Sequence, residues 1–130
     1  MAVSFDGRLD EPHSSDGLSD AACVAGVYEH AGDRFASQLN GDFALALFDS
    51  RQRQLFLARD VMGTRRLHYT RRGDTLFFAS DIKSLLSQPG VDAVYDEDAI
   101  AEIVLDKWLD GHRTCFKDIY SVPPGHLIVA

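Results

Sequence analysis

An uninterrupted apolar segment, residues 43–48 (FALALF), constrains the fold of this chain more than any other feature. If it is a strand, its odd-numbered residues share one face and its even-numbered residues share the other. A strand that is apolar on both faces must be covered on both sides, which excludes a solvent-washed position in the sheet. Residues 49–53 then turn the chain, and residues 54–59 predict an antiparallel hairpin partner.

The rest of the chain alternates between the two-residue period of strands and the 3.6-residue period of helices. Strand patterns predict further strands over residues 2–9, 67–69, 75–79 and 126–129. Helical patterns predict a helix capped by Ser19 or Asp20 and closed by Gly32, and further helices over 33–39, 81–87 and 96–109, while Asn40-Gly41 predicts a turn. No repeat or linker interrupts the sequence, so we expect one α+β domain over residues 1–130.

Composition excludes several classes of function. The 130 residues include 13 Lys and Arg against 20 Asp and Glu, so the formal net charge is −7. An acidic surface repels phosphate groups, so neither a nucleic acid nor an anionic membrane is expected as a partner. No apolar run approaches the roughly 20 residues of a membrane span. With only Cys23 and Cys115, and no secretory signal, the sequence predicts a cytoplasmic protein without a disulfide framework.

The residues by themselves indicate little chemistry. The five histidines are scattered, and His112 with Cys115 lacks a third ligand, so no metal site and no cofactor are expected. Cys23 is expected to pack as a small apolar side chain. The pair Arg59-Asp60 at a strand end fits a structural bridge better than a binding pair. The basic residues at 65–66 and 71–72 are expected to form a solvated face.

Four ordered sequence blocks resemble motifs of asparagine synthetases. LNGDFALALFD (39–49) resembles LNGxFAFALWD, LARDVMG (57–63) resembles LARDxxG, and FASDIKSL (78–85) resembles FASEIKAL. The fourth block, RTCF (113–116) followed by PPGH (123–126), resembles RTxF…PPGH. The chain therefore resembles the class II glutamine amidotransferase domain, an N-terminal-nucleophile hydrolase. That resemblance implies an αββα sandwich of mostly antiparallel sheets with flanking helices, and here a partial one.

The resemblance also implies that the catalytic machinery is missing. In the family a cysteine directly follows the initiator methionine and acts with its free amine as nucleophile and base. Here residue 2 is Ala2, and we expect the nucleophile segment to be absent. The family's Asn-Gly-Glu oxyanion motif reads Asp6-Gly7-Arg8, and a carboxylate would repel the oxyanion. Asp20 matches the aspartate that holds the substrate's α-amino group. We therefore expect no catalytic residue, and Asp6, Gly7 and Asp20 as vestigial substrate-binding residues.

The string at residues 6–10 is similar to degenerate relatives such as lasso-peptide cyclases, which adenylate a carboxylate with ATP. This similarity implies a catalytically silent scaffold or interaction domain whose partner is an ATP-dependent synthetase domain or subunit. The chain itself has no SGGxDS-type loop and hence no synthetase domain. One alternative is half of a split amidotransferase, completed by a chain that carries the N-terminal cysteine. Another is a free-standing, self-assembling binding domain. Self-association is expected in any case, because missing strands would leave a sheet edge exposed.

Overall fold

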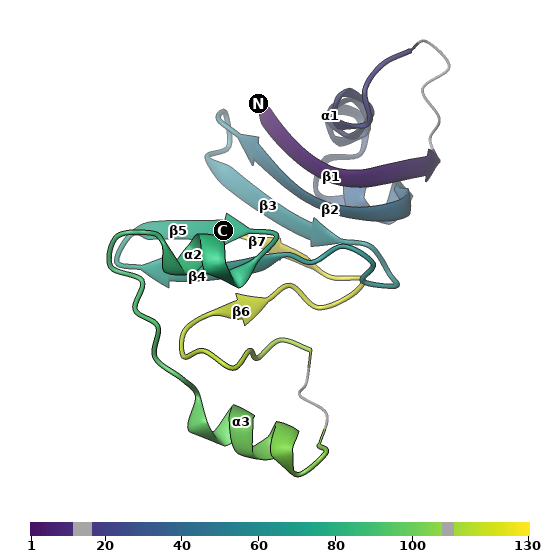
Figure 1. Ribbon diagram of the computed structural model, residues 1–130. Helices are drawn as coiled ribbons and strands as arrows, with labels where there is room; N and C mark the ends of the chain where they lie inside the picture. Colours follow the sequence, from purple (N-terminus) through teal and green to yellow (C-terminus); the bar gives the residue numbers. More distant parts are fainter. Residues whose placement is uncertain (12–16, 108–110) are drawn as a thin grey trace. The chain divides into compact units, whose positions relative to one another are not determined.

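The computed structural model describes residues 1–11, 17–107 and 111–130. It is an α+β structure with two antiparallel sheets and a few helices, which confirms the expected fold class. The chain divides into two compact units (Figure 1), of which the first comprises residues 1–65 and 124–130 and the second residues 66–123. Each unit contains one of the sheets.

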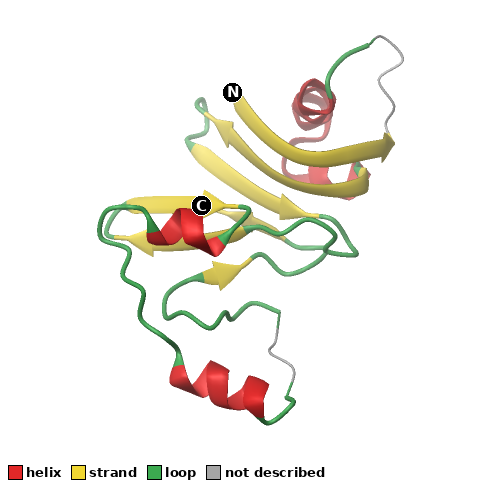
Figure 2. Ribbon diagram, in the orientation of Figure 1, coloured by secondary structure: helices red, strands yellow, loops and turns green. Residues whose placement is uncertain are grey.

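The first unit is a four-stranded antiparallel sheet with helices (Figure 2). Its strands, in sheet order, are β1 (Ala2–Glu11), β2 (Asn40–Asp49), β3 (Gln54–Arg59) and β7 (Leu127–Val129). Helix α1 (Asp20–Ala31) and the 3₁₀-helix η1 (Gly32–Gln38) connect β1 to β2. Ser19 caps α1, since its Oγ accepts a hydrogen bond from the Ala22 amide at 3.3 Å.

Burial follows the two-sided pattern of β2. Leu45 and Leu47 on its odd-numbered face are at most 1% exposed and belong to one core with Val24 of α1 and Phe35 of η1. On the even-numbered face Ala44 and Ala46 are also buried, whereas Phe48 at the end of the strand is 43% exposed. The prediction of a strand covered on both sides is thus confirmed for all of the segment except its last residue.

The second unit contains a smaller antiparallel sheet. Its strands are β5 (Thr75–Ala79), β4 (His68–Arg72) and β6 (Tyr120–Ser121), in that order. Helices α2 (Ile82–Leu86) and α3 (Glu97–Val104) follow β5 along the chain, and Asp81 and Asp96 cap them. The β4–β5 hairpin confirms the predicted pairing of 67–69 with 75–79, while the two-residue β6 was not predicted.

Two predicted boundaries are wrong. Asn40-Gly41 is the start of β2 and not a turn; a Cβ at Gly41 would lie 2.3 Å from the Arg8 carbonyl oxygen, so glycine is needed for the close approach of β1. The helix predicted over 96–109 ends at Val104, and Asp106 has a left-handed φ of 56° that stops it. The last two residues of that prediction, Trp108 and Leu109, lie outside the described residues. No helix in the described ranges is long and apolar enough to cross a membrane.

A buried hydrogen bond joins α1 to the β2–β3 hairpin. The Tyr28 hydroxyl donates to Asp49 Oδ2 at 2.9 Å, and Asp49 Oδ1 accepts from the Arg51 amide at 2.7 Å. Burial, together with the neighbouring Asp49 carboxylate, raises the pKa of Tyr28 to about 12. The tyrosine therefore stays neutral and donates its proton to the carboxylate that shapes the hairpin turn.

We expect Tyr28→Phe to lower the free energy of unfolding by about 1–2 kcal/mol, because the Asp49 oxygen stays buried without its donor. Urea denaturation followed by circular dichroism measures the change. Tyr95→Phe is the matched control, since Tyr95 is 60% exposed and its change should stay within about 0.5 kcal/mol. Equal effects of the two substitutions would contradict a specific role for the Tyr28–Asp49 bond.

Candidate functional site

Asp6 and Gly7 lie next to each other in the middle of β1. In the antiparallel register Asp6 is opposite Ala44 and Gly7 is opposite Phe43. Gly7 has a φ of 135°, and a Cβ there would lie 1.9 Å from the Asp42 carbonyl oxygen. Only glycine allows β1 and β2 to approach so closely at this point.

The amide of Gly7 points away from β2. The Phe43 carbonyl accepts a hydrogen bond from the Asp60 amide at 2.9 Å, so the polar backbone groups of Phe43 face β3. Gly7 and Phe43 are therefore a non-hydrogen-bonded pair, and the N–H and C=O of Gly7 point out of the free edge of β1.

Asp20 lies at this same edge. It is the first residue of α1, and its Oδ2 accepts a hydrogen bond from the Leu9 amide at 3.1 Å. Leu9 is two residues beyond Gly7, so both amides point from one edge of the strand. The structure thus places Asp20 at the same edge of β1 as Gly7, through its bond to Leu9.

Sequence reasoning missed a partner of Asp6. Arg65 Nη1 lies 3.8 Å from Asp6 Oδ1, with both side chains about half exposed. The sequence predicts only a solvated face at residues 65–66, and the ion pair shows that Arg65 also compensates the carboxylate on β1. The signal that could have found it is the position of Arg65 just after the LARDVMG block, at the end of a turn that returns to the same sheet.

That turn is built around the buried carboxylate of Asp60. Asp60 Oδ2 accepts a hydrogen bond from the Thr64 amide at 2.9 Å and another from the Arg65 amide at 3.4 Å. The Asp60 carbonyl accepts from the amides of Gly63 and Gly125, and Arg59 Nη2 donates to the Gly63 carbonyl at 2.6 Å. Arg59 and Asp60 thus organise a loop, in agreement with the structural interpretation of the pair.

Two opposing effects act on the Asp60 carboxyl. Burial favours the protonated form, but the hydrogen bonds from Thr64 and Arg65 outweigh it and hold the pKa of Asp60 below its usual value. Asp60 is therefore an ionised anchor for the turn, and its oxygens are already engaged by the loop itself.

A cleft of about 640 Å³ opens beside the turn within the first unit. Its walls carry both signs of charge, from Asp33, Arg34, Asp42, Arg59 and His126 among others. Asp6, Gly7 and Asp20 do not line it. The residues that the resemblance assigns to substrate binding therefore lie on a strand edge and not in this cleft.

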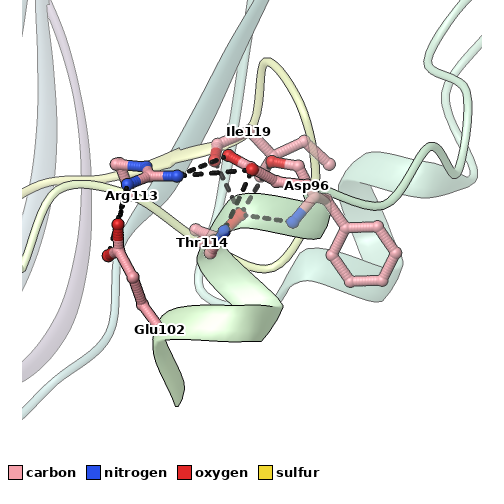
Figure 3. Close-up of polar contacts among 7 residues, drawn as sticks. Asp96, Glu102, Arg113, Thr114 and Ile119 are labelled. Carbon is pink, nitrogen blue, oxygen red and sulfur yellow. Dashed lines mark hydrogen bonds and ion pairs between the residues drawn. The ribbon is translucent and has the colours of Figure 1, made fainter. Parts of the chain in front are cut away.

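The RTCF block has a structural role in the second unit (Figure 3). Arg113 forms ion pairs with Asp96 and Glu102, each at 3.2 Å, and these bonds raise the pKa of Arg113. Thr114 Oγ1 donates to the Ile119 carbonyl at 2.7 Å and accepts from the Phe116 amide at 3.1 Å. The block thus fixes the segment after α3 to both ends of that helix.

The remaining candidates form no reactive centre. Cys23 packs against the core of the first unit, as predicted, and Cys23 and Cys115 are both free thiols. His112 Nδ1 contacts the Ser121 carbonyl at 3.1 Å. Within residues 1–11, 17–107 and 111–130, no group of three or more His, Cys, Asp or Glu side chains could hold a metal ion.

Comparison with known proteins places these features in a family. Residues 7–130 match a family model described as "Glutamine amidotransferase domain". The chain belongs to this glutamine amidotransferase domain family. It is 34% identical to the amidase chry2 of Gibberella zeae over 113 residues. This alignment covers 87% of this chain and 16% of that protein. It is 32% identical to asparagine synthetase [glutamine-hydrolyzing] 3 of Bacillus subtilis over 120 residues. This second alignment covers 89% of this chain and 19% of that protein.

The matched region is a small part of these relatives. The chain spans less than a fifth of the length of either protein. The amidase chyE of Penicillium rubens shows the same proportion, with 34% identity over 88% of this chain and 16% of the relative. The match to a glutamine amidotransferase domain thus identifies the domain, and the chemistry of the longer proteins belongs to their full chains.

We expect Gly7→Ala to destabilise the domain by about 3 kcal/mol or more, because the new Cβ would collide with backbone and the φ would be strained. Urea denaturation measures the loss. Gly26→Ala is the matched control: Gly26 lies in α1, and no atom lies within 4 Å of the position that a Cβ would take there, so it should stabilise by about 0.5–1 kcal/mol. A mild effect at Gly7 would contradict the close approach of β1 to β2.

The Asp60 anchor predicts acid sensitivity. The pKa of Asp60 is lower in the folded chain than its ordinary value near 3.9. The ionised carboxylate therefore stabilises the folded chain fully above about pH 3.9. This stabilisation is lost as the pH falls from about 3.9 through the lower pKa of the folded chain. We expect Asp60→Asn to be less stable than wild type at neutral pH and to show a smaller further loss on acidification. Urea titrations from about pH 7 to about pH 3 test this, with exposed Asp92→Asn expected to follow wild type.

Proposed function

We propose that this chain is a catalytically silent glutamine amidotransferase-like domain that serves as a scaffold or interaction domain for an ATP-dependent amide-forming partner. The proposal rests on the β1 edge. There a carboxylate, Asp6, stands where the family has the asparagine of its oxyanion site, and Asp20 is bound to the Leu9 amide within the same chain. The Asp20 carboxylate is thus used within the fold.

Electrostatics supports the absence of glutamine hydrolysis. Hydrolysis of the glutamine amide passes through an oxyanion that needs hydrogen-bond donors, and a carboxylate beside the Gly7 amide opposes that charge. Arg65 compensates the charge of Asp6 at 3.8 Å, but both side chains are about half exposed, where solvent screens such a pair. Asp6 is thus paired with Arg65, and Asp20 accepts the Leu9 amide. Of the three residues, only Gly7 has a polar group, its backbone amide, without a partner among the described residues.

The partner is inferred from the relatives. Their names include glutamine-hydrolyzing asparagine synthetases, and they are several times longer than this chain. We propose that the partner is a synthetase domain or subunit that activates a carboxylate with ATP, as in lasso-peptide cyclase-like systems. Within the proposal residues 1–130 act as one domain in the cytoplasm, and the domain self-associates.

The silent-domain proposal predicts no glutamate when the chain is incubated with L-glutamine, measured by a coupled glutamate dehydrogenase assay. Asp6→Asn should also give none, because restoring the amide supplies no nucleophile. Glutamate formation by the wild-type chain above the buffer blank would contradict the proposal. Glutamate formed only after addition of a chain with an N-terminal cysteine would instead support the split amidotransferase.

The scaffold part needs a separate measurement. The natural protein is captured from its source and its intact mass is determined, and the captured material is assayed for ATP–pyrophosphate exchange with candidate carboxylic acids. We expect exchange activity together with a longer bait or a second chain. A 130-residue chain captured without exchange activity would favour the free-standing binding domain.

A further inference from the structure

A serine hydroxyl of the second unit is hydrogen-bonded to an imidazole. Ser121 Oγ lies 2.9 Å from His68 Nδ1, and this nitrogen is the one partner of the hydroxyl within residues 1–11, 17–107 and 111–130. Both residues lie outside the four sequence blocks that resemble asparagine synthetases, so those motifs do not account for the pair. A nucleophile within hydrogen-bond reach of a base is the arrangement that activates a hydroxyl group.

The register of the small sheet brings the two side chains together. His68 of β4 is directly opposite Ser121 of β6. The Ser121 amide donates to the His112 carbonyl at 2.8 Å and so points away from β4. The Val122 amide, one residue later, donates to the Leu67 carbonyl of the β4 side at 2.9 Å. His68 and Ser121 are therefore a non-hydrogen-bonded pair, the kind in which opposite side chains of an antiparallel ladder lie closest.

The hydroxyl is assigned as the donor in this contact. A serine hydroxyl has one proton to donate, and His68 Nδ1 is its acceptor in the described part of the chain. The Ser121 carbonyl is held separately, at 3.1 Å from His112 Nδ1. His68 Nδ1 then has a free electron pair in the neutral imidazole, and it can take the proton of the hydroxyl as a general base.

A carboxylate lies close to the imidazole. Ala79 is opposite His68 in the β4–β5 hairpin, and Asp81 follows two residues later as the cap of α2. The Ser84 amide and hydroxyl hold the Asp81 carboxylate at 2.8 and 2.7 Å. These bonds from Ser84 are the main cause that lowers the pKa of Asp81, and the charge of His68 contributes to the same shift. A negative charge is therefore present beside the imidazolium that forms when His68 takes a proton.

We infer that Ser121 is an acyl-acceptor site with His68 as its general base, and that it reacts with esters that have a good leaving group. The Ser121 oxygen forms a bond to the acyl carbon while its proton moves to His68 Nδ1. The ester C–O bond breaks, the leaving group departs as its anion, and His68 releases the proton to solvent. Both side chains are partly exposed, so a small ester can reach them.

The sheet also determines which esters react. The amides of Ser121 and Val122 are engaged by backbone carbonyls, so neither is available to stabilise an oxyanion. Without that stabilisation an ester must have a good leaving group, as p-nitrophenyl acetate does. The inference concerns the second unit and goes beyond the proposed function, because it does not involve Asp6, Gly7 or Asp20.

The first test incubates the wild-type 130-residue chain with p-nitrophenyl acetate and locates the acetyl groups by peptide mass spectrometry over time. Ser87 is the internal control. It is exposed, but its hydroxyl donates to the Ser84 carbonyl, which cannot act as a base. We expect Ser121 to be acetylated about 100-fold faster than Ser87, which is within the usual range of general-base assistance. Equal rates at the two serines would overturn the inference.

The second test removes the base. His68→Gln keeps a hydrogen-bonding side chain opposite Ser121 but none that takes a proton, so acetylation of Ser121 should fall about 100-fold. His30→Gln is the matched control, since His30 lies in α1 of the first unit and its Nδ1 contacts the Gly26 carbonyl; the Ser121 rate should stay at the wild-type value. Circular dichroism and an unchanged rate at Ser87 check that both variants fold. A Ser121 rate that His68→Gln leaves unchanged would show that the contact is only structural and would overturn the inference.

Discussion

Asp60 joins three parts of the first unit, through its buried carboxylate and through its backbone. Its side chain binds the amides of Thr64 and Arg65, and its backbone binds Phe43 of β2 and Gly125 ahead of β7. Three parts of the sheet thus meet at one residue that is 3% exposed. Because a buried charge is tolerated only when it is hydrogen-bonded, this turn has one geometry, and the positions of β2, β3 and β7 depend on it.

The same anchor determines how the β1 edge is presented. By drawing the Phe43 carbonyl toward β3, the Asp60 amide makes the Gly7 pair a non-hydrogen-bonded one, and the outward direction of Gly7 follows. Asp20 then closes the edge at Leu9. The alternation of hydrogen bonds between β1, β2 and β3 therefore connects the Asp60 turn with the edge of β1 at which Gly7 and Asp20 lie.

The sequence blocks shared with asparagine synthetases are largely accounted for by folding. LARDVMG forms the Asp60 turn. In RTCF, Arg113 holds both ends of α3, and Thr114 closes the following turn on Ile119. LNGDFALALFD provides the glycine contact at Gly41 and the buried β2. These blocks could persist without hydrolytic chemistry, because each stabilises packing or a turn. The departures lie in the motif that carries the chemistry of the family, where Asp6 and Arg8 replace its asparagine and glutamate.

The sequence by itself determined the α+β class, the strands and most helix starts, because apolar periodicity and capping residues such as Ser19, Asp81 and Asp96 act over a few neighbours. Through motif resemblance it also predicts Asp6, Gly7 and Asp20 as substrate-binding residues, and this stays a prediction. It missed the early end of α3, the strand Tyr120–Ser121 and the Arg65–Asp6 pair. Tertiary structure alone decided which amides of β1 face outward and that Asp20 binds one of them. Both features follow from hydrogen bonds between residues that are distant in the sequence. Local periodicity carries no information about such bonds.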